Sequence, residues 1–114
     1  MAKLSPEIRT TLSQQKEQLL DIIDRAKSLE FILLESVGEN PETVSTLEQL
    51  TEISEQARTR LSRLSTLHLL MAEVQPTVSD DLLILMNDAI ENVQNRIPAL
   101  ERSLEEIKLD WRLK

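Results

Sequence analysis

Apolar residues recur every three or four positions along three long stretches, and this periodicity constrains the fold more than any other feature. Because an α-helix turns once every 3.6 residues, such spacing gathers the apolar side chains on one face. Flanking apolar residues widen the face beyond the seam of a two-stranded coiled coil, which favours a bundle of three or more helices. The expected core positions are Ile8, Leu12, Gln15, Leu19, Ile22, Ala26, Leu29 and Leu33, then Leu47, Leu50, Ser54, Ala57, Leu61, Leu64, His68 and Met71, then Leu82, Met86, Ala89, Val93, Ile97, Leu100, Leu104, Ile107 and Trp111.

Cap-forming residues and prolines mark the ends of the first two helices. Ser5-Pro6-Glu7 and Asn40-Pro41-Glu42 each combine an N-cap residue, a proline at the first helical position and an acid near the positive end of the helix dipole. Gly38 can take the left-handed conformation that often ends a helix. Pro76 ends the second helix, because the residue before a proline avoids the helical region. We therefore predict helices over about 6–37 and 41–74.

The third predicted helix spans about 79–113 and contains an internal proline. Thr77 or Ser79 caps its start. Pro98 removes one backbone hydrogen bond and its ring presses on the carbonyl of Gln94, so we expect a kink near this position. A complete break into two helices is the alternative.

Composition supports an all-α fold with few loops. The chain has one glycine and no tyrosine, and its only aromatic residues are Phe31 and Trp111. Sheets favour aromatic residues and tight turns favour glycine, so their scarcity argues against both. The two short connections force neighbouring helices to run antiparallel. We predict a single domain, 1–114, that forms an up-down-up three-helix bundle of long, coiled-coil-like helices.

The net charge of −7 argues against nucleic acid or an anionic membrane as the main partner, because both repel an acidic surface. No stretch approaches the roughly 20 apolar residues that span a bilayer, so we expect no membrane insertion. The N-terminus lacks the apolar core of a signal peptide. The absence of cysteine fits a reducing compartment. We expect a cytoplasmic protein.

No motif for catalysis, a metal or a cofactor is evident, and we expect no enzyme activity. His68 is the only histidine. Phosphotransfer domains carry a reactive histidine on a bundle helix, but the lysine and glycine that usually follow it are missing here. A packed histidine at the edge of the core is the favoured interpretation. A di-iron site needs Glu-x-x-His pairs, and position 65 is Ser65.

Two charged clusters have simple interpretations. Glu17, Asp21 and Asp24 share one helix face and are interpreted as a solvated surface. Arg58, Arg60 and Arg63 form the only basic cluster, and neutralisation by neighbouring helices is favoured over a phosphate or acidic-partner site.

The joint between the second and third helices carries more apolar residues than a bundle helix buries, about three in seven. The opposing start of the first helix is polar. Contiguous exposed apolar patches usually mark partner surfaces. We therefore predict a partner interface here; covering by Met1–Leu4, or by a tilt of the third helix, is the alternative. The expected interface residues are Leu69, Leu70, Leu83, Ile84 and Leu85.

The favoured function is a non-enzymatic helical module for protein–protein interaction, an adaptor or scaffold, that self-associates through this tip as a homodimer. Two alternatives stay open. One is a small acidic chaperone that shields an apolar helix of a client. The other is a signalling or regulatory bundle that acts through His68.

Overall fold

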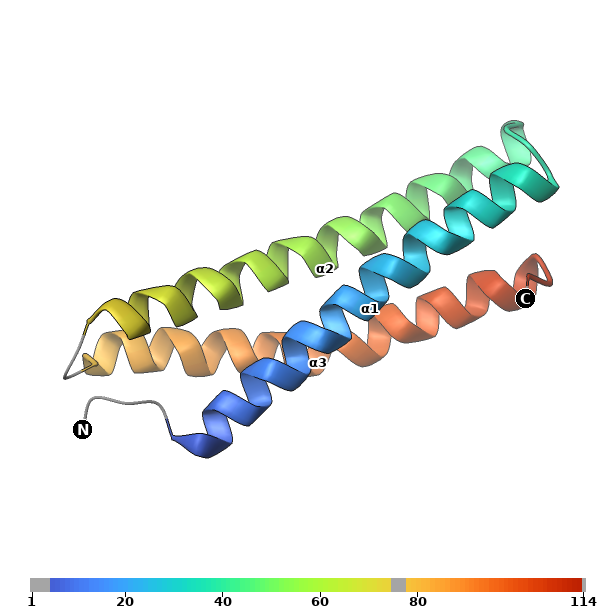
Figure 1. Ribbon diagram of the computed structural model, residues 1–114. Helices are drawn as coiled ribbons and strands as arrows, with labels where there is room; N and C mark the ends of the chain where they lie inside the picture. Colours follow the sequence, from blue (N-terminus) through green and yellow to red (C-terminus); the bar gives the residue numbers. More distant parts are fainter. Residues whose placement is uncertain (1–4, 75–77, 114) are drawn as a thin grey trace.

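The computed structural model, which describes residues 5–74 and 78–113, contains three long helices that all pack against one another. They are α1 (Pro6–Ser36), α2 (Pro41–Glu73) and α3 (Asp80–Asp110), and α2 runs antiparallel to the other two (Figure 1). The bundle is a rod with principal extents of 55, 18 and 17 Å. The described residues contain no strand. The predicted all-α three-helix bundle is confirmed.

Each helix begins at a residue that the sequence marks as an N-cap. The hydroxyl of Ser5 accepts a hydrogen bond from the N–H of Ile8 at 3.2 Å, and Ser79 does the same for Leu82 at 3.2 Å. At the start of α2, the side chain of Asn40 accepts from two backbone N–H groups. These bonds satisfy donors that a helix cannot pair internally. Ser79 is thus the cap of α3; Thr77 and Pro76 lie outside the described residues.

The first connection depends on a glycine. Gly38 has a φ of +84°, the left-handed region that side chains with a Cβ rarely adopt. Its carbonyl accepts a hydrogen bond from the hydroxyl of Thr43 at 2.9 Å, and the same hydroxyl accepts from the N–H of Asn40 at 2.9 Å. This arrangement joins the end of α1 to the start of α2 within four residues. It holds the two helices as antiparallel neighbours.

The core follows the predicted faces closely in α1 and α3 and less closely in α2. Leu47 and His68, both predicted on the seam, are only half-buried, whereas Leu67, Thr43 and Thr46 are buried. The seam of α2 therefore drifts away from a strict heptad, as a straight helix of 3.6 residues per turn must. The buried positions of α2 are Thr43, Thr46, Leu50, Ile53, Ser54, Ala57, Leu64, Leu67 and Met71.

Gln15 is the one amide side chain in the buried part of α1. Its Nε2 donates to the carbonyl of Ile90 at 3.0 Å, which ties α1 to α3. Its Oε1 has no hydrogen-bond partner among the described residues. A polar group at a core position fixes the register of neighbouring helices at a cost in stability.

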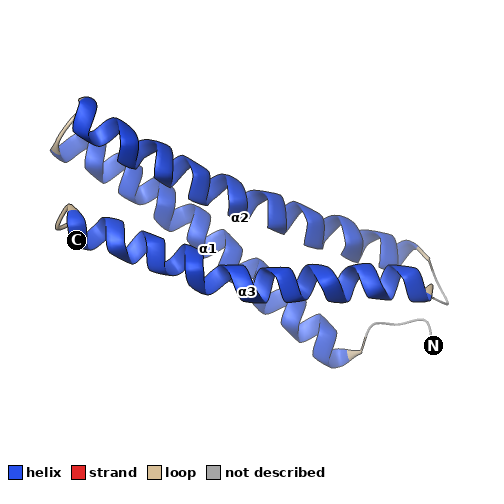
Figure 2. Ribbon diagram, turned by 180° about the vertical axis from the view of Figure 1, so that it is seen from behind, coloured by secondary structure: helices blue, strands red, loops and turns tan. Residues whose placement is uncertain are grey.

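α3 continues as one α-helix through Pro98, so the break into two helices is wrong. The helix axis changes direction about half-way along, which Figure 2 shows from the side where α3 lies in front. The missing N–H of a proline and the crowding of its ring account for such a bend. α3 lies beside α2 at the end of the rod that holds the second connection, and it diverges from α2 toward the C-terminus (Figure 1).

Hydrogen bonds between helices show how the helices are aligned along the rod. Arg60 Nε donates to Asn92 Oδ1 at 3.1 Å across α2 and α3. Arg25 pairs with Glu105 across α1 and α3 at 2.8 Å. Trp111, the C-cap residue of α3, is partly buried and packs against the core.

Candidate interaction surfaces

Four of the five predicted interface residues at the joint of α2 and α3 are exposed. Leu69 is 61% exposed, Ile84 57%, and Leu70 and Leu85 44% each. Leu83 differs, because it is half-buried and packs against the core. The exposed residue Val74, which the sequence prediction did not include, extends the group by one turn of α2. We call Leu70, Val74 and Leu85 the tip patch.

The five predicted residues do not form one continuous face. Consecutive residues of a helix lie about 100° apart, so Leu69 and Leu70 point in different directions, as do Ile84 and Leu85. Leu70 follows Arg63 by seven residues, and Leu85 precedes Asn92 by seven, so each shares a face with that residue. Arg63 and Asn92 line one groove between α2 and α3. Leu70 and Leu85 therefore extend the two walls of this groove to the tip.

One alternative explanation for the apolar tip does not hold. A tilt of α3 leaves Ile84 and Leu85 exposed rather than covered. The other alternative, a cover formed by Met1–Leu4, lies outside the described residues.

The groove next to the tip patch has a volume of about 350 Å³ and includes two of the three clustered arginines, Arg60 and Arg63. Arg60 also donates to the carbonyl of Gln56 at 3.2 Å. Burial, and then the positive charge of Arg96, lower the pKa of Arg60. Arg58 is exposed and does not line this groove. The cluster is thus divided between the groove and open surface.

His68 lies half-buried where α2 meets α1. Lys16 Nζ lies 2.9 Å from His68 Nδ1. An ammonium group only donates, so Nδ1 is the acceptor and the proton of the neutral ring is on Nε2. Burial, and then the charges of Lys16 and Arg9, lower the pKa of His68 below its ordinary value of 6.5. The geometry matches a packed histidine at the edge of the core.

This contact predicts a pH dependence of stability. Because folding lowers the pKa of His68, the unfolded chain binds the proton more readily. The contribution of His68 to the free energy of unfolding is fully present above pH 6.5, the ordinary pKa of histidine. It is lost as the pH falls through the lower pKa that His68 has in the folded protein. Urea unfolding between pH 8 and pH 5 should show a steeper loss of stability for the wild type than for His68→Gln. Parallel curves for the two proteins would exclude this role, since the carboxylates titrate alike in both.

The acidic residues of α1 form no cation site. Glu17 and Asp24 are exposed, and Asp21 lies 3.7 Å from Arg25 in an ion pair on the surface. Across residues 5–74 and 78–113, no group of three or more histidines, cysteines or acids could hold a metal ion. None of the three helices, as far as they are described, has the length and apolar content to cross a bilayer.

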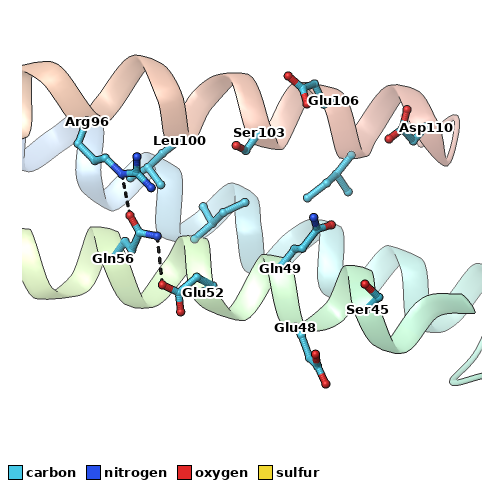
Figure 3. A pocket seen from close by; sticks show the side chains of 12 residues that line it. Ser45, Glu48, Gln49, Glu52, Gln56, Arg96, Leu100, Ser103, Glu106 and Asp110 are labelled. Atoms are coloured by element: carbon cyan, nitrogen blue, oxygen red, sulfur yellow. Dashed lines mark hydrogen bonds between the residues drawn. The ribbon is translucent and has the colours of Figure 1, made fainter. Parts of the chain in front are cut away.

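A second groove between α2 and α3, which sequence reasoning missed, lies toward the opposite end of the rod. It has a volume of about 460 Å³ and is lined by Ile53, Leu100 and Ile107 at its base. Figure 3 shows its walls, with Glu48 and Glu52 from α2 and Glu106 and Asp110 from α3. One sequence signal could have pointed to it: residues 28–57 hold seven glutamates and neither lysine nor arginine.

Cross-helix hydrogen bonds close this second groove at both ends. Arg96 Nε donates to Gln56 Oε1 at 2.7 Å, and Gln56 Nε2 donates in turn to Glu52 at 3.1 Å (Figure 3). At the other end, Trp111 Nε1 donates to Thr46 Oγ1 at 3.1 Å.

Comparison of the chain with protein families, with curated proteins and with solved structures finds no match. The two grooves and the tip patch are therefore the features on which a function can be argued.

Proposed function

We propose that this protein is a non-enzymatic helical interaction module that self-associates through the tip patch, with Leu70 and Leu85 at the centre of the contact. The observation that supports this proposal is the exposure of large apolar side chains at one end of the rod. Burying such a side chain fully is worth roughly 1.5–3 kcal/mol. Several of them at one place favour association over exposure to water.

A two-fold symmetric dimer suits this patch. In such a dimer the same surface of both copies meets itself, so a residue near the axis contacts its own counterpart. An apolar centre tolerates this self-contact, whereas a centre of one charge would repel itself. Arg63 on one wall of the adjoining groove and Asp88 on the other supply opposite charges near the margin of the patch.

The double variant Leu70→Glu/Leu85→Glu is expected to abolish self-association. It places two acids in each copy at a contact that excludes water, where unpaired charges are costly. Light scattering after size exclusion should give the mass of two chains for the wild type and of one chain for the variant.

A matched control keeps the chemistry and changes the location. Leu20→Glu/Leu109→Glu also replaces two exposed leucines, 49% and 73% exposed, away from the tip patch. This control should remain a dimer. Equal masses for the two double variants would contradict a contact centred on Leu70 and Leu85. A wild type that is monomeric throughout would remove self-association and leave the chaperone-like alternative, in which the patch meets a client.

A further inference from the structure

We propose that the acidic groove, lined by Ile53, Leu100 and Ile107 and walled by Glu48, Glu52, Glu106 and Asp110, is the docking site for a basic amphipathic helix of a partner protein. This site is separate from the tip patch and from the self-association proposed above. The partner helix would lie between α2 and α3 and add a fourth helix to the bundle.

The shape of the groove fits a helix. Between the hydrogen bonds Arg96–Gln56 and Trp111–Thr46, no hydrogen bond joins α2 to α3 within the described residues. Figure 1 shows the two helices diverging over this half of the rod. The lining runs from Ser45 to Gln56 on α2, which corresponds to about 16 Å or three turns at 1.5 Å per residue. A partner helix of three to four turns matches this length.

The base and the walls of the groove differ in chemistry, as the two sides of an amphipathic helix do. The base of the groove is formed by three buried apolar side chains of the bundle core, Ile53, Leu100 and Ile107. Ser103 lines the groove from α3 with a small side chain, whose hydroxyl donates to the carbonyl of Ala99 in its own helix at 3.1 Å (Figure 3). An apolar stripe on the partner would meet this base, in the mode by which helices bind grooves.

The acidic side chains of the groove indicate that a partner helix carries positive charge. Glu48 and Glu52 are four residues apart on one wall, and Glu106 and Asp110 are four apart on the other. Residues four apart lie one above the other on a helix, so each wall carries two acids along its length. Figure 3 shows the carboxylates of Glu48 and Glu106 turned toward the outer margins of the groove, where they would meet the flanks of a docked helix. Arg96 is the one basic residue of the lining, and its Nε donates a hydrogen bond to Gln56. A docked helix with lysine or arginine on both flanks of its apolar stripe complements this pattern.

The test uses the full chain and a designed 16-residue peptide, capped at both ends, with leucine and alanine on one face and lysines on both flanks. Binding is measured by fluorescence anisotropy, and amide chemical shifts locate the site. We expect shifts confined to residues 45–56 and 96–111. The variant Glu48→Gln/Glu52→Gln/Glu106→Gln/Asp110→Asn should bind at least about tenfold more weakly. Each exposed ion pair contributes only modestly, but the variant removes four of them together.

Two controls separate docking from general attraction between opposite charges. Glu17→Gln/Asp24→Asn/Glu55→Gln/Glu91→Gln changes the net charge equally at exposed positions outside the groove and should keep most of the affinity. Ser103→Phe leaves the charge unchanged but fills the groove, and it should block binding while circular dichroism shows an intact helix content.

Three results would overturn the docking site. They are no binding of the designed peptide, equal binding of a peptide with the same residues in scrambled order, and equal losses in the two fourfold variants. If the number of protein chains per complex rises in this test, the groove binds a second copy of this protein. That result would also overturn the proposal that it binds a helix of another protein. The variant Leu70→Glu/Leu85→Glu should bind the peptide like the wild type, so failure of one proposal does not imply failure of the other.

Discussion

Replacing Leu64 by alanine is expected to lower the free energy of unfolding by about 2–5 kcal/mol. Leu64 is fully buried, and it belongs to the core cluster to which all three helices contribute. Truncation removes its apolar contacts and leaves a cavity that long, mutually packed helices close only partly. Urea unfolding followed by circular dichroism measures the change. Both proteins must be compared at one concentration, because self-association makes the apparent stability depend on it.

Leu109→Ala supplies the matched control, since the same truncation is made at a side chain that is 73% exposed. This variant should stay within about 0.5 kcal/mol of the wild type. A Leu64→Ala protein as stable as the control would mean that α2 does not turn this face toward the core, and the packing described above would be wrong.

Replacing Pro98 by alanine is expected to raise the free energy of unfolding by about 1–3 kcal/mol. Pro98 is exposed and lies inside α3, so its side chain contributes little packing while its ring prevents one backbone hydrogen bond. Alanine restores the N–H donor for the carbonyl of Gln94 and is the best helix former. Urea unfolding again gives the magnitude.

Asn95→Ala is the control for Pro98→Ala, because it improves helix propensity at an exposed position of the same helix without restoring a hydrogen bond. Its gain should be about 0.5 kcal/mol. If Pro98→Ala were neutral or destabilising, the bend of α3 would itself be required for packing against α1. The acidic groove, which depends on the divergence of α2 and α3, should then also change in the variant.

The helices and most of their buried faces could be predicted from the sequence because their signals are local. Ser5, Asn40 and Ser79 cap the helices through bonds to residues two or three positions away. Gly38 ends α1 because of its own backbone freedom. In α1 the apolar repeat predicted every buried position, and the only expected core residue that is less than buried is Ile8.

Features that depend on how far apart two helices lie could not be predicted in this way. Thr43 is buried because its hydroxyl closes the turn at Gly38, which no apolar repeat indicates. The pairing of Arg25 with Glu105 needs the axial offset of α1 and α3 to better than one turn. The prediction of the tip identified exposed residues but treated Leu83 like its neighbours, although it turns toward the core. The glutamates of residues 28–57 signal the acidic character of the second groove, but its opening arises from the divergence of two helices, which no local pattern indicates.

The most direct test of association through the tip is a distance between two copies in solution. The chain has no cysteine, so Glu73→Cys and Glu42→Cys each provide one attachment point for a nitroxide spin label, at exposed positions near opposite ends of the rod. Double electron–electron resonance between copies should give a distance well below 55 Å, the length of one bundle, for the label at position 73. For position 42 it should give a distance above that length. A short distance at position 42, or none at either position while the protein is dimeric, would contradict a contact through Leu70 and Leu85.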